Sequence, residues 1–396
     1  MITQADNVVI AGGGLAAVRT AQALRDLKYP GRITLLSDEA CLPYDRPPLS
    51  KGYLQGKANA EKIRLASPDK LAELNIEVRL NKPVSGLDRN ERRVRLADGT
   101  WVHYGQLVVA TGARPIMLEQ LRPFRNVHVL RRITDADALH AALIPGRRLA
   151  IIGAGFIGLE IAATATEMGC QVTLIEAAKT PLAAILGMQL GEGIQRWHER
   201  KGVRFRCDAK LAKVIGDPFV EALELTDGTS LQVDVVVVGI GQTPNIEWLA
   251  GSGLELHRGL VCDALGQTTD PLVFGVGDAV CCRVGSEHRP TRHWTATTEQ
   301  ARRVAGAICG QPETGPIFED NYFWSDQHGS RLQFVGEVPT DPRLVWVSGS
   351  PSEDRFAVLC CTAEHVAAVF SLGSVRDFLV HSMPLRRGER VAAPVL

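Results

Sequence analysis

Two glycine-rich strings contain the residues best suited to holding a reactive cofactor. They are VVIAGGGLAA at 8–17 and LAIIGAGFIG at 149–158, and each follows an apolar run and opens a helical pattern. In a βαβ unit the first glycine permits a tight turn, the second lets backbone N–H groups approach a pyrophosphate, and the third position packs helix against strand. The spacing therefore predicts two dinucleotide sites. Their residues are Gly12, Gly14, Leu15, Ala16 and Ala17 in the first, and Gly153, Gly155, Phe156, Ile157 and Gly158 in the second.

An acidic residue follows the second apolar run of each unit, where it can recognise a ribose. Glu176 stands about 20 residues beyond its glycines, so its carboxylate can accept hydrogen bonds from both adenosine ribose hydroxyls. A 2′-phosphate would be repelled there, which favours NADH over NADPH, although Lys179 nearby can soften the preference. Asp38 takes the matching place in the first unit, with Ser37 at the strand end itself.

Two dinucleotide sites in one chain suit hydride exchange between a nicotinamide and a flavin. A single glycine string is more often only a structural turn, whereas two copies in a complete βαβ context favour binding. A non-enzymatic dinucleotide sensor would keep both strings and remains an alternative of another class.

Apolar runs and turn residues predict two similar halves followed by a smaller region. The first half is expected to contain strands at 8–11, 32–36, 76–80, 84–87, 92–96 and 106–110 and a helix at 15–27. The second is expected to contain strands at 147–152, 171–176 and 233–239 and helices at 156–168 and 187–200. A helix at 297–309 follows, and strands at 332–335, 344–347, 357–361 and 366–370 then precede an amphipathic stretch at 375–380. The prediction is an α/β fold of two doubly wound Rossmann-like domains plus a small α+β C-terminal domain.

The composition excludes several classes of protein. The 396 residues are 45% hydrophobic and 22% charged with zero net charge, so neither a nucleic acid nor a membrane is an expected partner. The longest apolar run, 235–241, is too short to span a bilayer. The nine cysteines form no CxxC pair, which predicts neither a disulfide framework nor a metal site; reduced thiols in a cytoplasm are the expected state.

Six further strings, in order along nearly the whole chain, resemble a known family. They are LPYDRPPLSK (42–51), LVVATGARP (107–115), VVVGIG (236–241), VFGVGDA (273–279), HWTATTEQA (293–301) and YFWSDQ (322–327). The chain resembles the ferredoxin reductase components of bacterial aromatic-ring dioxygenases and of P450 systems, which are glutathione-reductase-like flavoproteins. The resemblance implies FAD on the first glycine string and NADH on the second. It gives an FAD domain at 1–112 and 243–319, an NAD domain at 113–242, and a C-terminal domain at 320–396.

The resemblance also implies cofactor contacts beyond the glycine strings. For FAD, these are Asp38, Arg46, Lys51, Val84, Ala110, Thr111, Gly112, Arg131, Gly277, Asp278, Trp294 and Trp324. For NAD, they are Glu160, Glu176, Lys179, Ile240 and Gly241.

Three of these residues are expected to act in catalysis: Lys51, Glu160 and Trp324. A lysine near flavin N5 offers positive charge, a glutamate just after the third glycine can reach the nicotinamide and flavin, and the tryptophan lies beside the flavin ring. The alternative for Glu160 is an acid in the first turn of a helix, and for Trp324 and Trp294 it is core packing.

Related disulfide reductases carry CxxxxC or a single redox cysteine on the helix after the second strand of the first domain, to take electrons from the flavin. Here that region reads PPLSKGY (47–53) and has no cysteine. Electrons are therefore expected to pass directly to a one-electron acceptor, a [2Fe-2S] ferredoxin of Rieske type or plant and vertebrate type that feeds an oxygenase. An NADH oxidase or a flavoprotein like apoptosis-inducing factor, using oxygen or a quinone, is the alternative among enzymes.

Overall fold

The computed structural model describes residues 7–285, 287–290, 294–313 and 321–394, and its contacts divide the chain into two compact units. Unit 1 comprises residues up to 45, residues 60–114 and the described residues from 242 to 313. Unit 2 comprises residues 46–59, 115–241 and the described residues from 321 onward. Within the described ranges, no helix has the length and apolar character needed to cross a membrane.

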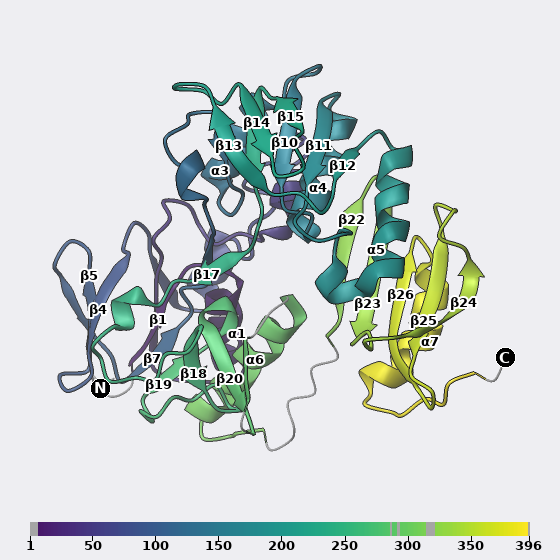
Figure 1. The fold of residues 1–396 in the computed structure, drawn as a ribbon. Coiled ribbons are helices and arrows are strands. Elements are labelled where there is room, and N and C mark those ends of the chain that lie inside the picture. The colour runs from purple at the N-terminus through teal and green to yellow at the C-terminus, as the bar shows by residue number, and fades with distance from the viewer. Residues whose placement is uncertain (1–6, 286, 291–293, 314–320, 395–396) are drawn as a thin grey trace. The chain divides into compact units, whose positions relative to one another are not determined.

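A parallel five-stranded sheet forms the centre of unit 1 (Figure 1). Its strands, in spatial order, are β19 (Val273–Gly275), β7 (Gln106–Val109), β1 (Asn7–Ala11), β2 (Arg32–Leu36) and β3 (Ile76–Arg79). Helices α1 (Leu15–Asp26) and α6 (Trp294–Ile308) share one apolar cluster with one face of this sheet, and α2 (Pro68–Glu73) contacts β3.

Smaller strands cover the other face of that sheet, where they share a second apolar cluster with it. They belong to an antiparallel sheet of β4 (Val84–Asp88), β5 (Arg93–Leu96) and β6 (Trp101–His103), and to a sheet of β18 (Leu260–Cys262), β20 (Val280–Val284) and β21 (Glu287–Pro290). β8 (Ala113–Pro115) and β17 (Gln242–Pro244) form a two-stranded sheet.

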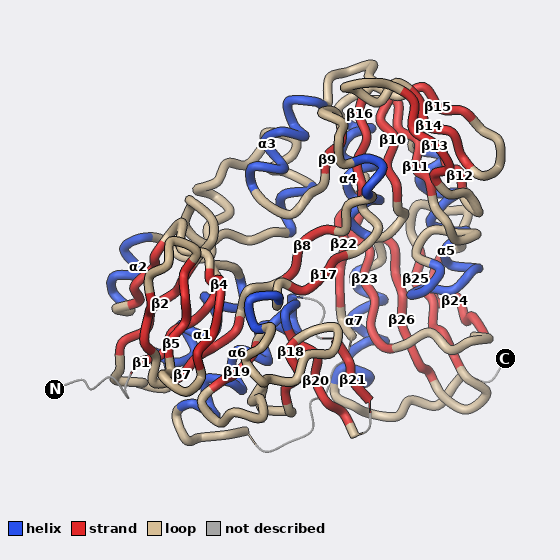
Figure 2. Tube along the Cα trace, turned by 60° about the vertical axis from the view of Figure 1, so that its left-hand side comes forward, coloured by secondary structure: helices blue, strands red, loops and turns tan. Residues whose placement is uncertain are grey.

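The second parallel sheet, of five strands, lies in unit 2 (Figure 2). The strands, in spatial order, are β12 (Arg204–Arg206), β11 (Gln171–Ile175), β10 (Arg148–Ile152), β16 (Val235–Val238) and β9 (Val127–His128). One face packs against α3 (Ile133–Ala142), α4 (Phe156–Glu167) and α5 (Ala183–Arg200). The other packs against β13 (Leu211–Ile215), β14 (Ala222–Leu225) and β15 (Ser230–Gln232).

An antiparallel five-stranded sheet completes unit 2 (Figure 1). Its order is β22 (Phe323–Gln327), β23 (Ser330–Gly336), β26 (Val366–Leu372), β25 (Phe356–Cys361) and β24 (Arg343–Gly349). Phe323, Phe334 and Phe370 on one face join the apolar cluster of α4 and α5. On the other face, Phe378 of α7 (Val375–Arg386) packs on Val335 and Val369, so both faces are covered.

The predicted fold class is confirmed, and most predicted strands and helices lie within three residues of the observed ones. The helix predicted from 187 begins earlier, at Ala183, because two helical segments meet at Gly187, which has a φ of 73°. The predictions missed α2, α3, β22 and many of the short strands, among them β13, β14 and β20, and His293 of the HWTATTEQA string lies outside the described residues. The domain boundaries drawn at 112, 242 and 319 stay a prediction.

Gly153 and Gly155 of the second string are expected to have different roles, the first in folding and the second in binding. At Gly153, where φ is +106°, a Cβ would lie 2.4 Å from the carbonyl oxygen of Gly239, whereas at Gly155 a Cβ would meet no atom within 4 Å. We expect Gly153→Ala to lower the free energy of unfolding by about 2 kcal/mol or more, since both backbone strain and overlap oppose it. Gly155→Ala should leave stability nearly unchanged. Chemical denaturation of both variants measures the difference, and equal losses would contradict it.

Candidate active site

Both glycine strings form open cradles at the N-terminus of a helix. Gly14 and Gly155 are the N-cap residues of α1 and α4, and neither helix has a side-chain cap. A Cβ at either glycine would project into open space, whereas at Gly12 it would lie 2.1 Å from the carbonyl oxygen of Ala110. The free N–H groups and partial positive charge of a helix start suit a pyrophosphate. The two cradles therefore fit the two predicted dinucleotides.

The third fingerprint positions pack helix on strand, as predicted. A Cβ at Gly158 would lie 2.1 Å from the carbonyl oxygen of Gly153, so only glycine fits there without a shift. Ala17 is fully buried in the cluster that joins α1 to the sheet. Leu15 is half-buried, Ile157 is 45% exposed, and the ring of Phe156 meets that of Phe323 at a centroid distance of 4.4 Å.

Backbone hydrogen bonds hold the Glu176 carboxylate beside the second cradle. Its Oε2 accepts from the N–H of Ala154 at 2.7 Å, and its Oε1 accepts from the N–H of Ala178 at 2.9 Å. The carboxylate is half-buried at the end of β11, and Lys179 is exposed. The ribose contact itself stays a prediction. In unit 1, Asp38 is exposed, and Ser37 lies so close to Gly13 that a Cβ there would approach its Oγ to 2.2 Å.

Three other predicted FAD contacts of unit 1 are Gly277, Asp278 and Trp294. A Cβ at Gly277 would lie 3.1 Å from the Cβ of Ala16, and the N–H of Gly277 donates to Gln300 of α6 at 2.8 Å. Asp278, the next residue, is half-buried in a short 3₁₀ helix. Trp294 donates from its indole Nε1 to Asp45 at 3.2 Å.

The AlaThrGly turn after β7 is tied to a distant segment of the same unit. The Thr111 hydroxyl donates to the carbonyl of Asn245 at 2.6 Å, and the N–H of Asn245 donates to the carbonyl of Gly112 at 2.8 Å. Ala110 is buried, and Val84 packs at the edge of the cluster under β4. Their cofactor contacts stay predictions.

In unit 2, Lys51 and Glu160 form an ion pair. Lys51 follows a 3₁₀ helix at Pro47–Ser50, and its Nζ lies 2.7 Å from Oε2 of Glu160. Glu160 is 4% exposed and lies beyond the first turn of α4, so the alternative of an acid in the first turn of a helix is wrong. The hydroxyls of Ser50 and Ser325 also donate to Glu160, the second at 2.5 Å. A buried carboxylate with three donors can hold a lysine ammonium in a fixed place.

The other predicted site residues of unit 2 are distributed over three segments. The Arg46 guanidinium donates to the carbonyl of Arg131, whose N–H is in turn held by Asp135 at 2.9 Å. Trp324 is half-buried on β22 and stacks on Tyr322 at 6.0 Å between ring centroids. Ile240 and Gly241 are exposed just after β16.

Sequence reasoning missed the polar residues that continue beyond Glu160. Gln327 donates to Ser325 at 2.9 Å, its Oε1 lies 2.7 Å from Nε2 of His198, and Nδ1 of His198 lies 3.0 Å from Nε2 of His328. Ser325 and Gln327 lie within the YFWSDQ string, two residues apart and therefore on one face of a strand. That alternation was the available signal, whereas no sequence pattern singled out His198.

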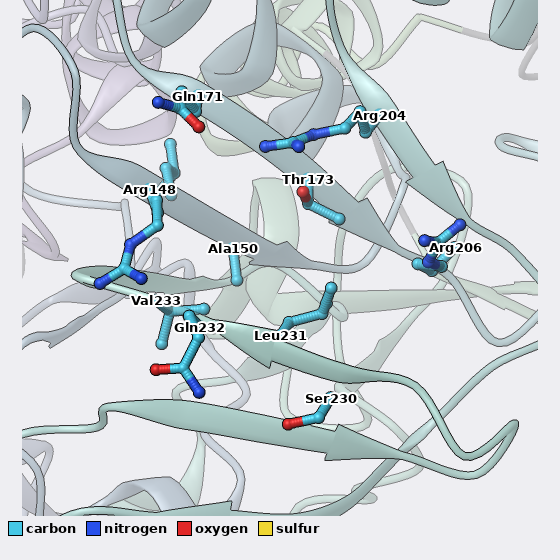
Figure 3. A pocket seen from close by; sticks show the side chains of 11 residues that line it. Arg148, Ala150, Gln171, Thr173, Arg204, Arg206, Ser230, Leu231, Gln232 and Val233 are labelled. Atoms are coloured by element: carbon cyan, nitrogen blue, oxygen red, sulfur yellow. The ribbon is translucent and has the colours of Figure 1, made fainter.

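A cavity of about 240 Å³ lies elsewhere in unit 2 (Figure 3). It is lined by the sheet strands and β15, with three arginines at its edges: Arg148, Arg204 and Arg206. Arg148 pairs with Asp234 at 2.5 Å. None of the predicted site residues lines this cavity.

The fold and the two cradles define a class, the two-dinucleotide α/β oxidoreductases. Comparison with family profiles matches residues 6–301 to the pyridine nucleotide-disulphide oxidoreductases and residues 322–396 to the reductase C-terminal domain. The chain belongs to the pyridine nucleotide-disulphide oxidoreductase family. Members of this family bind FAD and a pyridine nucleotide, which confirms the predicted cofactors.

Individual relatives confirm the resemblance to ferredoxin reductases. Putidaredoxin reductase CamA of Pseudomonas putida is 36% identical, with 94% of this chain and 90% of that protein covered. The ferredoxin–NAD(+) reductase component of the biphenyl dioxygenase system of Paraburkholderia xenovorans is 33% identical, with 95% and 92% covered. Among solved structures, the ferredoxin reductase for the CYP199A2 system of Rhodopseudomonas palustris is 33% identical, with a TM-score of 0.92 over 98% of this chain and 96% of that one. The reductase in a covalent putidaredoxin reductase–putidaredoxin complex gives 0.89 at 33% identity, over 96% and 93%.

Removal of the Glu176 carboxylate tests the ribose contact. We expect Glu176→Ala to raise the KM for NADH by about tenfold and to narrow the difference between NADH and NADPH, because a charge-assisted hydrogen bond is lost. Steady-state kinetics with both nucleotides measures this. Glu192→Ala, at an exposed position of α5, is the matched control. An unchanged KM and an unchanged ratio in Glu176→Ala would show that the assignment is wrong.

The two histidines make stability depend on pH. Burial lowers the pKa of His198 to about 3, helped by His328, and lowers the pKa of His328 to about 4, where Lys201 also contributes and Asp354 opposes. Because both values lie below the ordinary 6.5, the neutral rings stabilise the fold above pH 6.5, and this stability is lost as pH falls toward 4. The midpoint of chemical denaturation should therefore decrease as the pH is lowered from 6.5 toward 4.

His328→Gln should flatten that dependence, since one of the two rings no longer titrates. His103→Gln, at an exposed histidine of unit 1, controls for the loss of an imidazole. The same slope in wild type and His328→Gln would contradict the interpretation.

Proposed function

We propose that this chain is an NADH-dependent ferredoxin reductase that delivers electrons to a [2Fe-2S] ferredoxin serving an oxygenase. The observation that carries the proposal is the segment 47–51. Its sequence, Pro-Pro-Leu-Ser-Lys, places Lys51 on the buried Glu160 in the region where disulfide reductases have redox cysteines. With no thiol there to relay electrons, a one-electron protein acceptor is the chemically sensible partner. The named activities of the relatives support the same conclusion.

The proposed contacts divide between the two cradles. Gly12, Gly14 and the start of α1 would hold the pyrophosphate of FAD; Gly153, Gly155 and Glu176 would hold NADH. When bound, FAD would provide a group that can accept a hydride and release electrons one at a time. Lys51 presents a fixed positive charge, and Glu160 prevents that ammonium from turning away. Trp324 would shield the reacting position from water.

The division into an FAD domain at 1–112 and 243–319, an NAD domain at 113–242 and a C-terminal domain at 320–396 is part of this proposal. A cytoplasmic location is part of it too. It is supported by the spacing of the nine cysteines, which form no CxxC pair and suit a reducing compartment.

Addition of a ferredoxin separates this function from its alternatives. In a stopped-flow experiment NADH should bleach the flavin rapidly, and cytochrome c reduction should then depend strongly on an added [2Fe-2S] ferredoxin, since the protein acceptor carries electrons singly. Peroxide formation that ferredoxin leaves unchanged would instead identify an oxidase. Slow bleaching with no acceptor would favour a dinucleotide sensor. A ferredoxin reconstituted without its cluster is the control.

A further inference from the structure

A chain of buried hydrogen bonds runs from Glu160 to the end of α5, and none of the roles above uses it. Ser325 Oγ donates to Glu160 Oε1 at 2.5 Å, and Gln327 Nε2 donates to Ser325 Oγ at 2.9 Å. Gln327 Oε1 faces His198 Nε2 at 2.7 Å. The exposed fractions of Ser325, Gln327 and His198 are 0%, 2% and 0%.

The donors of this chain can all point in one direction. An ionised Glu160 only accepts, so the Ser325 hydroxyl must donate to it, and the Ser325 oxygen then accepts from the Gln327 amide. That leaves the Gln327 carbonyl for His198, which must carry its proton on Nε2. The free Nδ1 of a neutral His198 then accepts from His328 Nε2 at 3.0 Å. The donor hydrogen of each bond in the chain therefore points toward Glu160.

This direction of the hydrogen bonds requires the rings of His198 and His328 to be neutral, and their environment favours the neutral form. Burial lowers the pKa of both His198 and His328, so each ring carries one N–H at neutral pH. The charged groups that face the chain are Lys51 and Glu160 at its inner end, and Lys201 and Asp354 beside His328. Lys201 and Asp354 pair with each other at 2.6 Å.

We propose that Ser325, Gln327 and His198, with His328 at the outer end, are positioning residues that fix the Glu160 carboxyl group through Oε1 and leave its Oε2 for Lys51 and the Ser50 hydroxyl. The Ser325 hydroxyl stabilises the charged form of Glu160 more than the neutral form, because a carboxylate oxygen accepts a stronger hydrogen bond than the carbonyl oxygen of a carboxylic acid. Gln327 donates to the Ser325 oxygen and His198 fixes the Gln327 amide, so both keep the Ser325 hydroxyl directed at Oε1.

This chain orients charge and is not a route for protons. An amide such as that of Gln327 passes a proton only by forming an unfavourable imidic acid, so the chain is interrupted at its centre. The effect on the reaction rests on the proposed function, because it acts through Lys51 and Glu160. The effect on the protonation of Glu160 does not depend on that function.

Two substitutions should weaken the chain in different ways. Ser325→Ala removes the hydroxyl that donates to Glu160. Gln327→Glu keeps the size but replaces a donor with an acceptor, so that two carboxylates compete for the single Ser325 hydroxyl proton. The control is Ser371→Ala, at a fully buried serine of β26 whose Oγ has no hydrogen-bond partner among the described residues.

The test is an infrared titration of the full-length, FAD-loaded protein, with the carboxyl band of Glu160 identified by its loss in Glu160→Gln. In Ser325→Ala and Gln327→Glu the titration midpoint of this band should rise by about one pH unit, a tenfold gain in proton affinity. In Ser371→Ala it should stay at the wild-type value. A wild-type midpoint in Gln327→Glu, which keeps the packing, would overturn the proposal even if Ser325→Ala failed to fold.

The rate of flavin bleaching by NADH, measured over the same pH range, separates this inference from the proposed function. If the titration midpoint of Glu160 and the pH profile of the rate shift together, both the inference and the proposed function are supported. If the midpoint shifts but Glu160→Gln bleaches at the wild-type rate, the chain is supported and the role of Glu160 in the reaction is wrong.

Discussion

The ion pair of Lys51 and Glu160 is the constraint on which the organisation of unit 2 depends. A carboxylate that is 4% exposed is costly unless opposite charge and hydrogen bonds compensate it. The compensation comes from segments far from α4 in the sequence: Ser50 and Lys51 before it, and Ser325 of β22 after it. These segments must therefore meet in the folded unit. Thr164 of α4 strengthens the same junction by donating to the carbonyl of Ser50 at 2.7 Å.

The glycine cradles obey two different requirements that look identical in the sequence. Gly12, Gly153 and Gly158 are needed by the fold, because a Cβ at each would overlap a backbone carbonyl. At Gly14 and Gly155 a Cβ would meet only open space, so packing does not require glycine there, and room for the proposed ligand is the reason that remains. The structure thus explains why the fingerprint has several glycines: some close the turn, and others leave room for a pyrophosphate.

The sequence was a good guide where local periodicity was strong. The strands and helices of both βαβ units follow from apolar runs, and the glycine strings located both cradles. β22 was missed because two of the three residues on its buried face, Ser325 and Gln327, are polar. Only Phe323 gives that face an apolar residue, so the strand lacks the usual alternation of apolar and polar residues. α3 was missed because its apolar residues, most of them alanines, do not gather on one face of the helix, while its start is fixed by Asp135, which holds the N–H groups of Arg131 and Arg132.

The candidate site was predictable only in part, for a physical reason. Roles for Lys51 and Glu160 were expected from family resemblance, but their ion pair was not, since nothing in their separation along the chain brings them together. The involvement of His198 depends on where the end of α5 meets β22, which is a property of tertiary packing.

A double-mutant cycle on Lys51 and Glu160 tests the central claim most directly, because it asks whether the two charges act as one unit in the reaction. The measured quantity is the single-turnover rate of flavin reduction by NADH in wild type, Lys51→Met, Glu160→Gln and the double variant. The account predicts that the double variant is about tenfold faster than the product of the two single effects would give. Two effects that simply multiply would contradict it.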